Sequence, residues 1–355
     1  MSDVSRDVVV VGGGPVGLGA ALYAVRAGLS VVVLEPREGP VDKACGEGLM
    51  PGGVQALAAL GVSPPGQDLV GIRYVSGANQ AQAEFGHGPG RGVRRTGLHG
   101  ALRSAVAAAG VDVLPLAAGE LTQSADGVCV RGHEPGRAGG PRLSGRYLLA
   151  ADGLHSPTRR ALGLEVGARG PQRFGQRRHY GIPPWTSYVE VHWGRHGEAY
   201  VTPVGSDMVG VAVLSASRLP FDAQLEQFPV LRERLRNAAA LTPVRGAGPL
   251  RQRASRRVAG RVLLVGDAGG YVDALTGEGI SLGLAQASAA VRALAVDRPG
   301  AYERGWSRAS WRYAAMTHAL VQATRPDWAR RAIVPAARAL PAVFRAAVDE
   351  LGRPS

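Results

Sequence analysis

Two residue types are scarce in this chain of 355 residues, and each shortage excludes a class of protein. The only cysteines are Cys45 and Cys129, which lie far apart and form neither a CxxC pair nor a metal-ligand spacing. We therefore expect no disulfide framework, no bound metal and no disulfide-reductase chemistry. Free cysteines also fit a reducing, cytoplasmic compartment.

Lysine is the second shortage, although the chain is strongly basic. Of the 41 basic residues behind the formal net charge of +13, only Lys43 is a lysine. The arginines are scattered as single residues and short pairs, and aromatic residues make up only 5% of the chain. Nucleic-acid binding is therefore not expected, because it usually needs clustered basic and stacking residues. The charge favours anionic small molecules and leaves a peripheral membrane contact open. No pattern defines the oligomeric state.

The chain also has no convincing signal peptide or membrane span. Residues 8–25 are almost wholly apolar, but Gly12, Gly13, Gly14 and Pro15 interrupt them. A buried strand, a glycine turn and a packed helix explain this stretch better than a transmembrane helix.

The glycine turn fits the dinucleotide-binding pattern GxGxxG between a β-branched strand at 7–11 and a helix at 16–27. The first glycine allows the tight turn, the second lets the backbone approach a pyrophosphate, and the third permits close helix–strand packing. An acidic residue ends the next strand, where it would hold ribose hydroxyls. The residues predicted to bind the nucleotide here are Gly12, Gly14, Pro15, Val16, Gly17 and Glu35.

The pattern of strands and helices predicts an α/β fold with a discontinuous Rossmann-like domain. Buried apolar runs predict strands at 30–34, 111–114, 147–151 and 261–265, and helices are predicted at 51–60, 98–109 and 278–295. Alternating segments at 188–193, 198–201 and 208–214 predict an inserted antiparallel sheet with one covered face. The predicted nucleotide-binding domain comprises residues 1–70, 92–175 and 255–299, the β-rich substrate domain 71–91 and 176–254, and a C-terminal helical segment 300–355.

Two later motifs distinguish one dinucleotide from another. An Asp-Gly pair ends the strand at 147–151, and a Gly-Asp pair follows the strand at 261–265 and continues into TGEGI at 276–280. The residues of interest in these motifs are Asp152, Gly153, Gly266, Asp267, Gly277, Gly279 and Ile280.

The ordered motifs resemble the superfamily that joins para-hydroxybenzoate-hydroxylase-type monooxygenases, geranylgeranyl reductases and flavin-dependent halogenases. The KACGEGL segment at 43–49 and the TGEGI segment are similar to the geranylgeranyl-reductase branch. The resemblance implies a glutathione-reductase-type FAD-binding domain and NAD(P)H as a transient electron donor. It also implies that Arg95 contacts FAD, that Gly46 lies near the isoalloxazine ring, and that Asp267 accepts a hydrogen bond from the ribityl chain.

The same resemblance makes Cys45 and Glu47 the candidate catalytic residues. Cys45 would shape the substrate pocket or donate a proton beside the flavin, and the alternative is a buried structural thiol. Lys43 would supply the electropositive setting that thiol reactivity requires. Glu47 would act as an acid or base, or as an anion at a helix N-terminus.

Aromatic residues of the inserted sheet are the candidate substrate contacts. Tyr200 is the first choice, and Trp193 and His192 are the others. They would line a pocket for a planar or lipophilic small molecule, and the alternative is an ordinary half-buried sheet face.

These observations favour an FAD-dependent monooxygenase that hydroxylates a lipophilic aromatic or polyketide-like molecule with NAD(P)H and oxygen. The segment 198–203 supports hydroxylation, because only Tyr200 and Pro203 correspond to the aromatic segment that lines the prenyl tunnel of the reductases. The CGEG and TGEGI segments support the alternative, a reductase of isoprenoid or other double bonds. A third reading is an FAD-holding accessory protein that helps a partner to mature.

Overall fold

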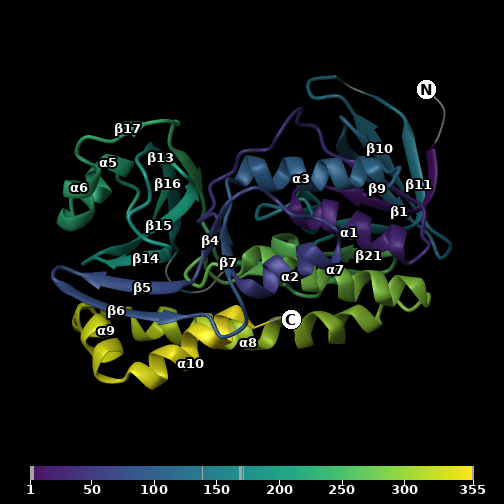
Figure 1. Ribbon diagram of the computed structural model, residues 1–355. Coiled ribbons are helices and arrows are strands. Elements are labelled where there is room, and N and C mark those ends of the chain that lie inside the picture. Colours follow the sequence, from purple (N-terminus) through teal and green to yellow (C-terminus); the bar gives the residue numbers. More distant parts are fainter. Residues whose placement is uncertain (1–3, 138, 168–169, 171, 354–355) are drawn as a thin grey trace.

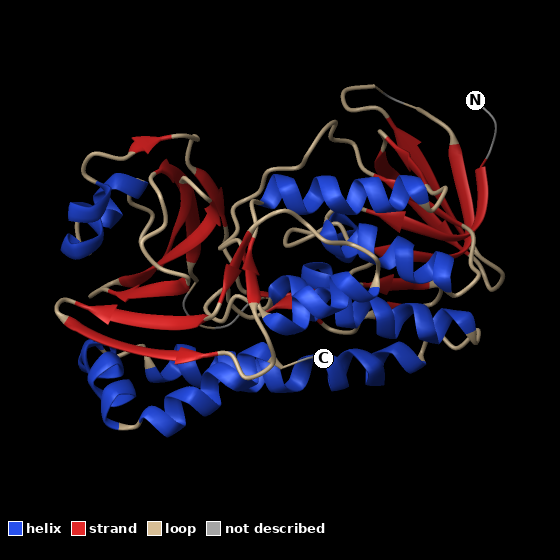
Figure 2. Cartoon of the chain, viewed as in Figure 1, coloured by secondary structure: helices blue, strands red, loops and turns tan. Residues whose placement is uncertain are grey.

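The computed structural model describes residues 4–137, 139–167, 170 and 172–353. Its two largest sheets have eight strands each and occupy opposite halves of the molecule, and the C-terminal helices run along one side (Figure 1). Figure 2 shows the same view with helices and strands distinguished by colour. The predicted α/β class, with a β-rich second part and helices at the C-terminus, is confirmed.

The first sheet contains the parallel core. Its strands follow the order β20–β21–β11–β1–β2–β8, and β10 and β9 extend it from β11. β1 pairs in parallel with both β11 and β2, and β11 pairs in parallel with β21. The strands are β1 (Val4–Val11), β2 (Val31–Leu34), β8 (Asp112–Leu114), β9 (Ala117–Gln123), β10 (Val128–His133), β11 (Arg142–Ala150), β20 (Val258–Ala259) and β21 (Val262–Leu264).

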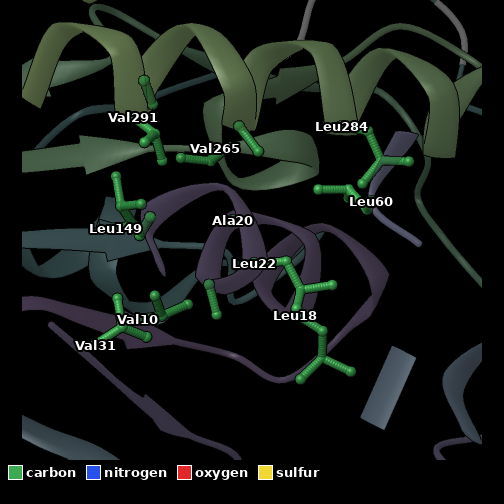
Figure 3. Packing of buried hydrophobic residues seen from close by; sticks show 14 of the residues in the cluster. Val10, Leu18, Ala20, Leu22, Val31, Leu60, Leu149, Val265, Leu284 and Val291 are labelled. Carbon is green, nitrogen blue, oxygen red and sulfur yellow. The ribbon is translucent and has the colours of Figure 1, made fainter. Parts of the chain in front are cut away.

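Apolar residues on both faces place β1 and β2 at the centre of this sheet. Residues Val8–Val11 and Val31–Leu34 are at most 6% exposed, as expected for parallel strands covered on both sides. Figure 3 shows Val10, Leu18 and Leu284 in one core cluster, where strand β1 and two helices meet. The helices that supply most of this cluster are α1 (Pro15–Arg26), α2 (Pro51–Ala59), α3 (Arg95–Ala108) and α7 (Gly279–Ala295), and Tyr302 joins it from the helix that follows α7.

The second sheet follows the order β17–β13–β16–β15–β14–β5–β6, with β18 paired to β13. Its pairs are antiparallel except β14 with β5, which is parallel. The prediction of an antiparallel sheet is therefore correct for every pair except this one. Its strands are β5 (Gly71–Ser76), β6 (Asn79–Glu84), β13 (Phe174–Gly181), β14 (Tyr188–Trp193), β15 (Gly197–Gly205), β16 (Met208–Ser215), β17 (Ala239–Ala240) and β18 (Arg245–Ala247).

Helices cover both faces of the second sheet. One face packs on two short helices, α5 (Phe221–Leu225) and α6 (Pro229–Leu235). The other face meets the C-terminal helices α9 (Asp327–Ala339) and α10 (Pro341–Gly352), which contact β5 and β6 (Figure 1). The preceding helix, α8 (Ala301–Ala323), packs on α7. Within the described residues, no helix combines the length and apolar character that crossing a membrane requires.

Short elements connect the two halves. One small sheet consists of β3 (Gly48–Leu49), β4 (Gln67–Leu69) and β7 (Gly90–Gly92), and another of β12 (Glu165–Val166), β19 (Gln252–Ala254) and β22 (Gly270–Tyr271). The short helix α4 (Pro157–Ala161) follows the Asp-Gly motif, and a 3₁₀ turn, η1 (Gly266–Gly269), carries the Gly-Asp motif. These elements bring the sequence motifs to the junction of the two halves.

Candidate functional site

A cavity of about 610 Å³ lies where these motifs converge. Ten of the predicted cofactor residues line it, namely Gly14, Pro15, Val16, Gly46, Arg95, Gly153, Asp267, Gly277, Gly279 and Ile280. The candidate catalytic residues Cys45 and Glu47 line it as well. The remaining predicted cofactor residues do not line it and are Gly12, Glu35 and Asp152 in adjoining loops, Gly17 in α1 and Gly266 in η1.

Gly12 and Gly17, at the turn from β1 into α1, have no room for a side chain. Gly12 has a φ of +103°, and a Cβ atom there would lie 2.4 Å from the Ala151 carbonyl oxygen. A Cβ atom at Gly17 would lie 1.8 Å from the Gly12 carbonyl oxygen. The loop can therefore turn tightly beneath the N-terminus of α1, which is the geometry that presents backbone amides to a phosphate.

Arg95 is the cation nearest to this loop. It is the first residue of α3, is 6% exposed, and places Nη2 3.9 Å from where a Cβ atom of Gly14 would lie. Its buried Nη1 atom has no hydrogen-bond partner among the described residues. A buried guanidinium with a free donor requires an anion. The residues present therefore fit the pyrophosphate of FAD, for which Arg95 would be a counter-ion.

Glu35 occupies the predicted place at the end of β2, but its carboxylate already has partners. Oε2 accepts a hydrogen bond from the Gly13 amide at 2.9 Å, and Arg37 donates to both oxygens at 2.7 Å. Burial would raise the pKa of Glu35, but these hydrogen bonds outweigh it and lower the pKa. A ribose hydroxyl would have to share the carboxylate with Arg37 or displace it. Sequence reasoning did not identify Arg37.

The Asp-Gly and Gly-Asp motifs are connected by a buried arginine. Arg159, which is 0% exposed, donates to the carbonyl oxygens of Leu154 at 3.0 Å and Ala268 at 3.1 Å. Asp152 accepts a hydrogen bond from the Thr158 amide at 3.0 Å, and its other oxygen is buried without a partner among the described residues. Arg159 therefore holds the two motifs together from behind the cavity.

Asp267 and Lys43 form a charged part of the cavity wall. Burial raises the pKa of Asp267, and the positive charge of Lys43 opposes that effect. The Lys43 ammonium lies against Gly153, 3.3 Å from where a Cβ atom would be. An aspartate there can accept hydrogen bonds from a polyol, as expected for the ribityl chain.

Cys45 is not in the setting that the sequence predicts for a reactive thiolate. Burial, followed by the negative charge of Glu47, raises the pKa of the Cys45 thiol. Its sulfur accepts a hydrogen bond from the Glu47 amide at 3.3 Å. Cys45 therefore remains a protonated thiol, because burial and the charge of Glu47 oppose its ionisation more than Arg95 and Arg177 assist it.

The predicted substrate residues divide between the two faces of the second sheet. Trp193 and Tyr200 line the cavity, and the Tyr200 hydroxyl donates to the Leu275 carbonyl oxygen at 2.8 Å. His192 does not line it and instead contacts Glu190 with its Nε2 atom at 3.2 Å. Adjacent residues of a strand point to opposite faces, so His192 and Trp193 cannot both face one pocket. The prediction for His192 therefore does not agree with the structure.

Several apolar residues that line this part of the cavity were missed. Tyr74 packs edge-on against Trp193 with ring centroids 5.4 Å apart. The others come from the turn before α2, from strands β5 and β14, and from helices α8 and α10. They are Met50, Ile72, Val189, Val191, Leu320 and Leu351. Apolar alternation along β14 would have identified Val189 and Val191 together with Trp193. No local pattern assigns α8 and α10 to the cavity.

Glu278 stands at the start of α7, within the TGEGI segment. Burial, with a contribution from the charge of Glu350, raises its pKa to about 8. Its Oε2 atom is buried and has no partner among the described residues. Glu278 is thus a mostly protonated carboxyl group at neutral pH.

Replacing Glu278 by glutamine is expected to remove part of the loss of stability at high pH. The pKa of Glu278 is about 8 in the folded chain, compared with its ordinary value of 4.5. Its favourable contribution is therefore complete below pH 4.5, decreases between these values and is lost above pH 8. Glu278→Gln should raise the unfolding free energy by roughly 4 kcal/mol more at pH 9 than at pH 5. Glu120→Gln, at an exposed position of β9, is the control and should show no such difference.

Comparison with known proteins identifies the family. The chain belongs to the FAD binding domain family, which it matches over residues 5–310. FAD is accordingly its cofactor, in agreement with the fit of the cavity.

Individual relatives include reductases, and a hydroxylase shares the fold. The chain is 32% identical to a menaquinone reductase of Mycobacterium tuberculosis, with 79% of this chain and 74% of that protein covered. It is 33% identical to a digeranylgeranylglycerophospholipid reductase of Methanothermobacter thermautotrophicus, with 78% and 74% covered. An anhydrotetracycline hydroxylase of Streptomyces rimosus has the same fold, with a TM-score of 0.74, 22% identity, and 98% of this chain and 76% of that chain covered.

Proposed function

We propose that this chain is an FAD-dependent reductase that uses NAD(P)H to saturate a carbon–carbon double bond of a lipophilic, isoprenoid-type molecule. The observation that carries the proposal is the cavity beside the FAD motifs. Its walls there are mainly apolar and aromatic, and they come from β5, β14, α8 and α10. Such walls suit an extended hydrocarbon better than a polar substrate.

The residues of the chain would bind the substrate, exclude water and supply a proton. Reduced FAD supplies a hydride when it is bound. Cys45 holds a proton at its sulfur, because burial and the charge of Glu47 raise its pKa. The Cys45 loop contacts both parts of the site, since Thr202 donates to the Gly46 carbonyl oxygen at 2.7 Å. Proton donation to the neighbouring carbon would complete the saturated bond.

The comparisons support reduction over hydroxylation. The menaquinone reductase and the digeranylgeranylglycerophospholipid reductase, each above 30% identity, are named as reductases, whereas the hydroxylase at 22% identity shows only the fold. Hydroxylation of a lipophilic aromatic molecule is the second candidate. The segment 198–203 favours it, because Tyr200 is the only aromatic residue there.

Product mass under anaerobic and aerobic conditions separates the two reactions. Holoenzyme reduced with NADH or NADPH without oxygen would be incubated with menaquinone or a geranylgeranylated glycerolipid. A product two mass units heavier, formed without oxygen and unchanged after exposure to air, supports the reductase, because a quinol would reoxidise and a saturated bond would not. A product sixteen mass units heavier, formed only with oxygen, supports the hydroxylase. If NAD(P)H is consumed in neither case, an accessory role in holding FAD becomes the better explanation.

Replacing Cys45 by serine is expected to slow product formation while FAD remains bound. Serine is similar in size but a much weaker acid, so the proton donor would be lost. We expect the turnover number to fall at least about tenfold, since general-acid groups contribute roughly 10²–10⁴-fold. Cys129→Ser, on β10, is the matched control and should turn over like the wild type. In a hydroxylase, Cys45→Ser would instead release hydrogen peroxide without product, which a peroxide assay would detect.

A further inference from the structure

The loop that carries Cys45 is held in place by side chains of the second sheet. Residues 43–47 line the cavity beside the FAD motifs, yet they belong to a segment without regular structure between β2 and β3. Such a segment keeps one conformation only when outside contacts define it. The contacts that do so converge on Glu47.

Glu47 is a buried hub with an unusual backbone. It is 4% exposed and has a φ of +61°, a left-handed conformation that a residue other than glycine keeps only when its surroundings enforce it. Oε1 accepts a hydrogen bond from the Arg95 amide at 2.7 Å, and Oε2 contacts Nε2 of His179 at 2.6 Å. The carboxylate therefore joins the start of α3, on the FAD side, to strand β13 of the second sheet.

His179 is in turn oriented by Arg177, two residues earlier on the same face of β13. Arg177 Nη1 contacts His179 Nδ1 at 3.1 Å, and the Thr242 hydroxyl lies 3.0 Å from the same nitrogen. A guanidinium can only donate, so Nδ1 accepts and Nε2 carries the proton that is donated to Glu47. Both side chains are at most 1% exposed.

Arg177 also holds the other end of the loop. Its Nη2 atom donates to the Lys43 carbonyl oxygen at 3.2 Å and pairs with the Asp42 carboxylate. The sheet leaves room for these contacts at Gly210, which is paired with His179, because a Cβ atom there would lie 2.9 Å from Glu47 Oε2. Arg177 and His179, two residues apart on the same face of β13, thus hold the loop at both ends.

We propose that Arg177 and His179 are positioning residues that set the conformation of the Cys45 loop beside FAD. Arg177 lines the cavity on the side of the second sheet, and His179 lies beside it on the same strand. His179 acts on Cys45 through Glu47, and Arg177 acts on it through residues 42–43. Glu47, which the sequence suggests as an acid or base, serves in this arrangement as the anchor. The proposal concerns the loop itself and holds for either reduction or hydroxylation.

Hydrogen exchange of the loop in the FAD-bound protein tests the proposal without reference to any substrate. In His179→Ala, backbone amides of residues 42–48 should exchange at least about tenfold faster than in the wild type, because Glu47 loses its contact with the second sheet at Oε2. The Cys45 thiol should react faster with a maleimide, measured in a Cys129→Ala background, and the flavin absorption band should shift. His179→Gln, which can still donate to Glu47 and accept from Arg177, should restore the wild-type exchange.

Arg178→Ala is the matched control. Arg178 lies on the opposite face of β13 and pairs with the exposed Asp222 at 2.8 Å, so its loss should leave loop exchange unchanged. Unchanged exchange in a folded His179→Ala protein, or equal acceleration in Arg178→Ala, would overturn the proposal. If His179→Ala does not fold, Thr202→Val decides. That variant removes only the hydrogen bond to Gly46, and faster loop exchange supports a loop held by the sheet while unchanged exchange overturns it.

Discussion

Replacing Gly17 by alanine is expected to abolish FAD binding and to destabilise the chain by about 3 kcal/mol or more. The added Cβ atom would lie 1.8 Å from the Gly12 carbonyl oxygen and 3.3 Å from the Ala151 Cβ atom. Neither neighbour can rotate away, because one is a backbone atom and the other is the methyl group of Ala151, directly after strand β11. The loop must open, and its amides then no longer converge on the pyrophosphate. Thermal unfolding and FAD titration would measure the two effects.

A second glycine-to-alanine substitution provides the control. Gly100 lies inside α3, and a Cβ atom there would meet nothing within 4 Å. Gly100→Ala should therefore keep FAD and gain about 0.5–1 kcal/mol of stability, because alanine is the better helix former. If Gly17→Ala behaves in the same way, the loop does not have the packing described above.

Replacing Arg95 by alanine is expected to lower FAD affinity about 100-fold. The guanidinium is buried with a free donor beside Gly14, and a charged hydrogen bond at such a site contributes roughly 1.5–3 kcal/mol, or about tenfold for each 1.4 kcal/mol. The folded chain should remain at least as stable without FAD, because burial of the unpaired cation opposes folding. FAD fluorescence titration and unfolding of the apoprotein would test both parts.

Arg95→Lys should lie between the wild type and alanine, because lysine keeps the charge but not the planar set of donors. Arg103→Ala, on the same helix but outside the cavity wall, should bind FAD normally. Equal FAD affinity in Arg95→Ala and Arg103→Ala would show that Arg95 is not the counter-ion of the pyrophosphate.

Local patterns were sufficient to predict the elements of the FAD-binding part. The helix predicted at 16–27 is Pro15–Arg26, and the one predicted at 278–295 is Gly279–Ala295. The strand predicted at 30–34 is Val31–Leu34. These elements are confirmed. They could be predicted because apolar periodicity and helix-ending glycines are properties of residues close together in the sequence.

Features that depend on distant residues could not be predicted in the same way. The parallel pairing of β14 with β5 joins segments more than a hundred residues apart, and alternation within either strand does not reveal its partner. The hydrogen bond from Arg37 to the Glu35 carboxylate depends on side-chain geometry. Leu320 and Leu351 reach the cavity through the packing of α8 and α10. The choice of His192 beside Trp193 failed for a simpler reason, since consecutive strand residues point in opposite directions.

The pairing of β11 between β1 and β21 has a consequence for synthesis of the chain on the ribosome. β1 and β11 are complete once Ala150 has been made, but β21 begins only at Val262. Until then β10 covers only the first part of that edge of β11, and residues Leu148–Ala150 have no partner there. Most of the second sheet is translated in the interval. Long-range parallel pairing of this kind folds late and exposes an adhesive strand edge meanwhile. The nascent chain should therefore depend on chaperones most strongly between these two points, before FAD has a complete site to enter.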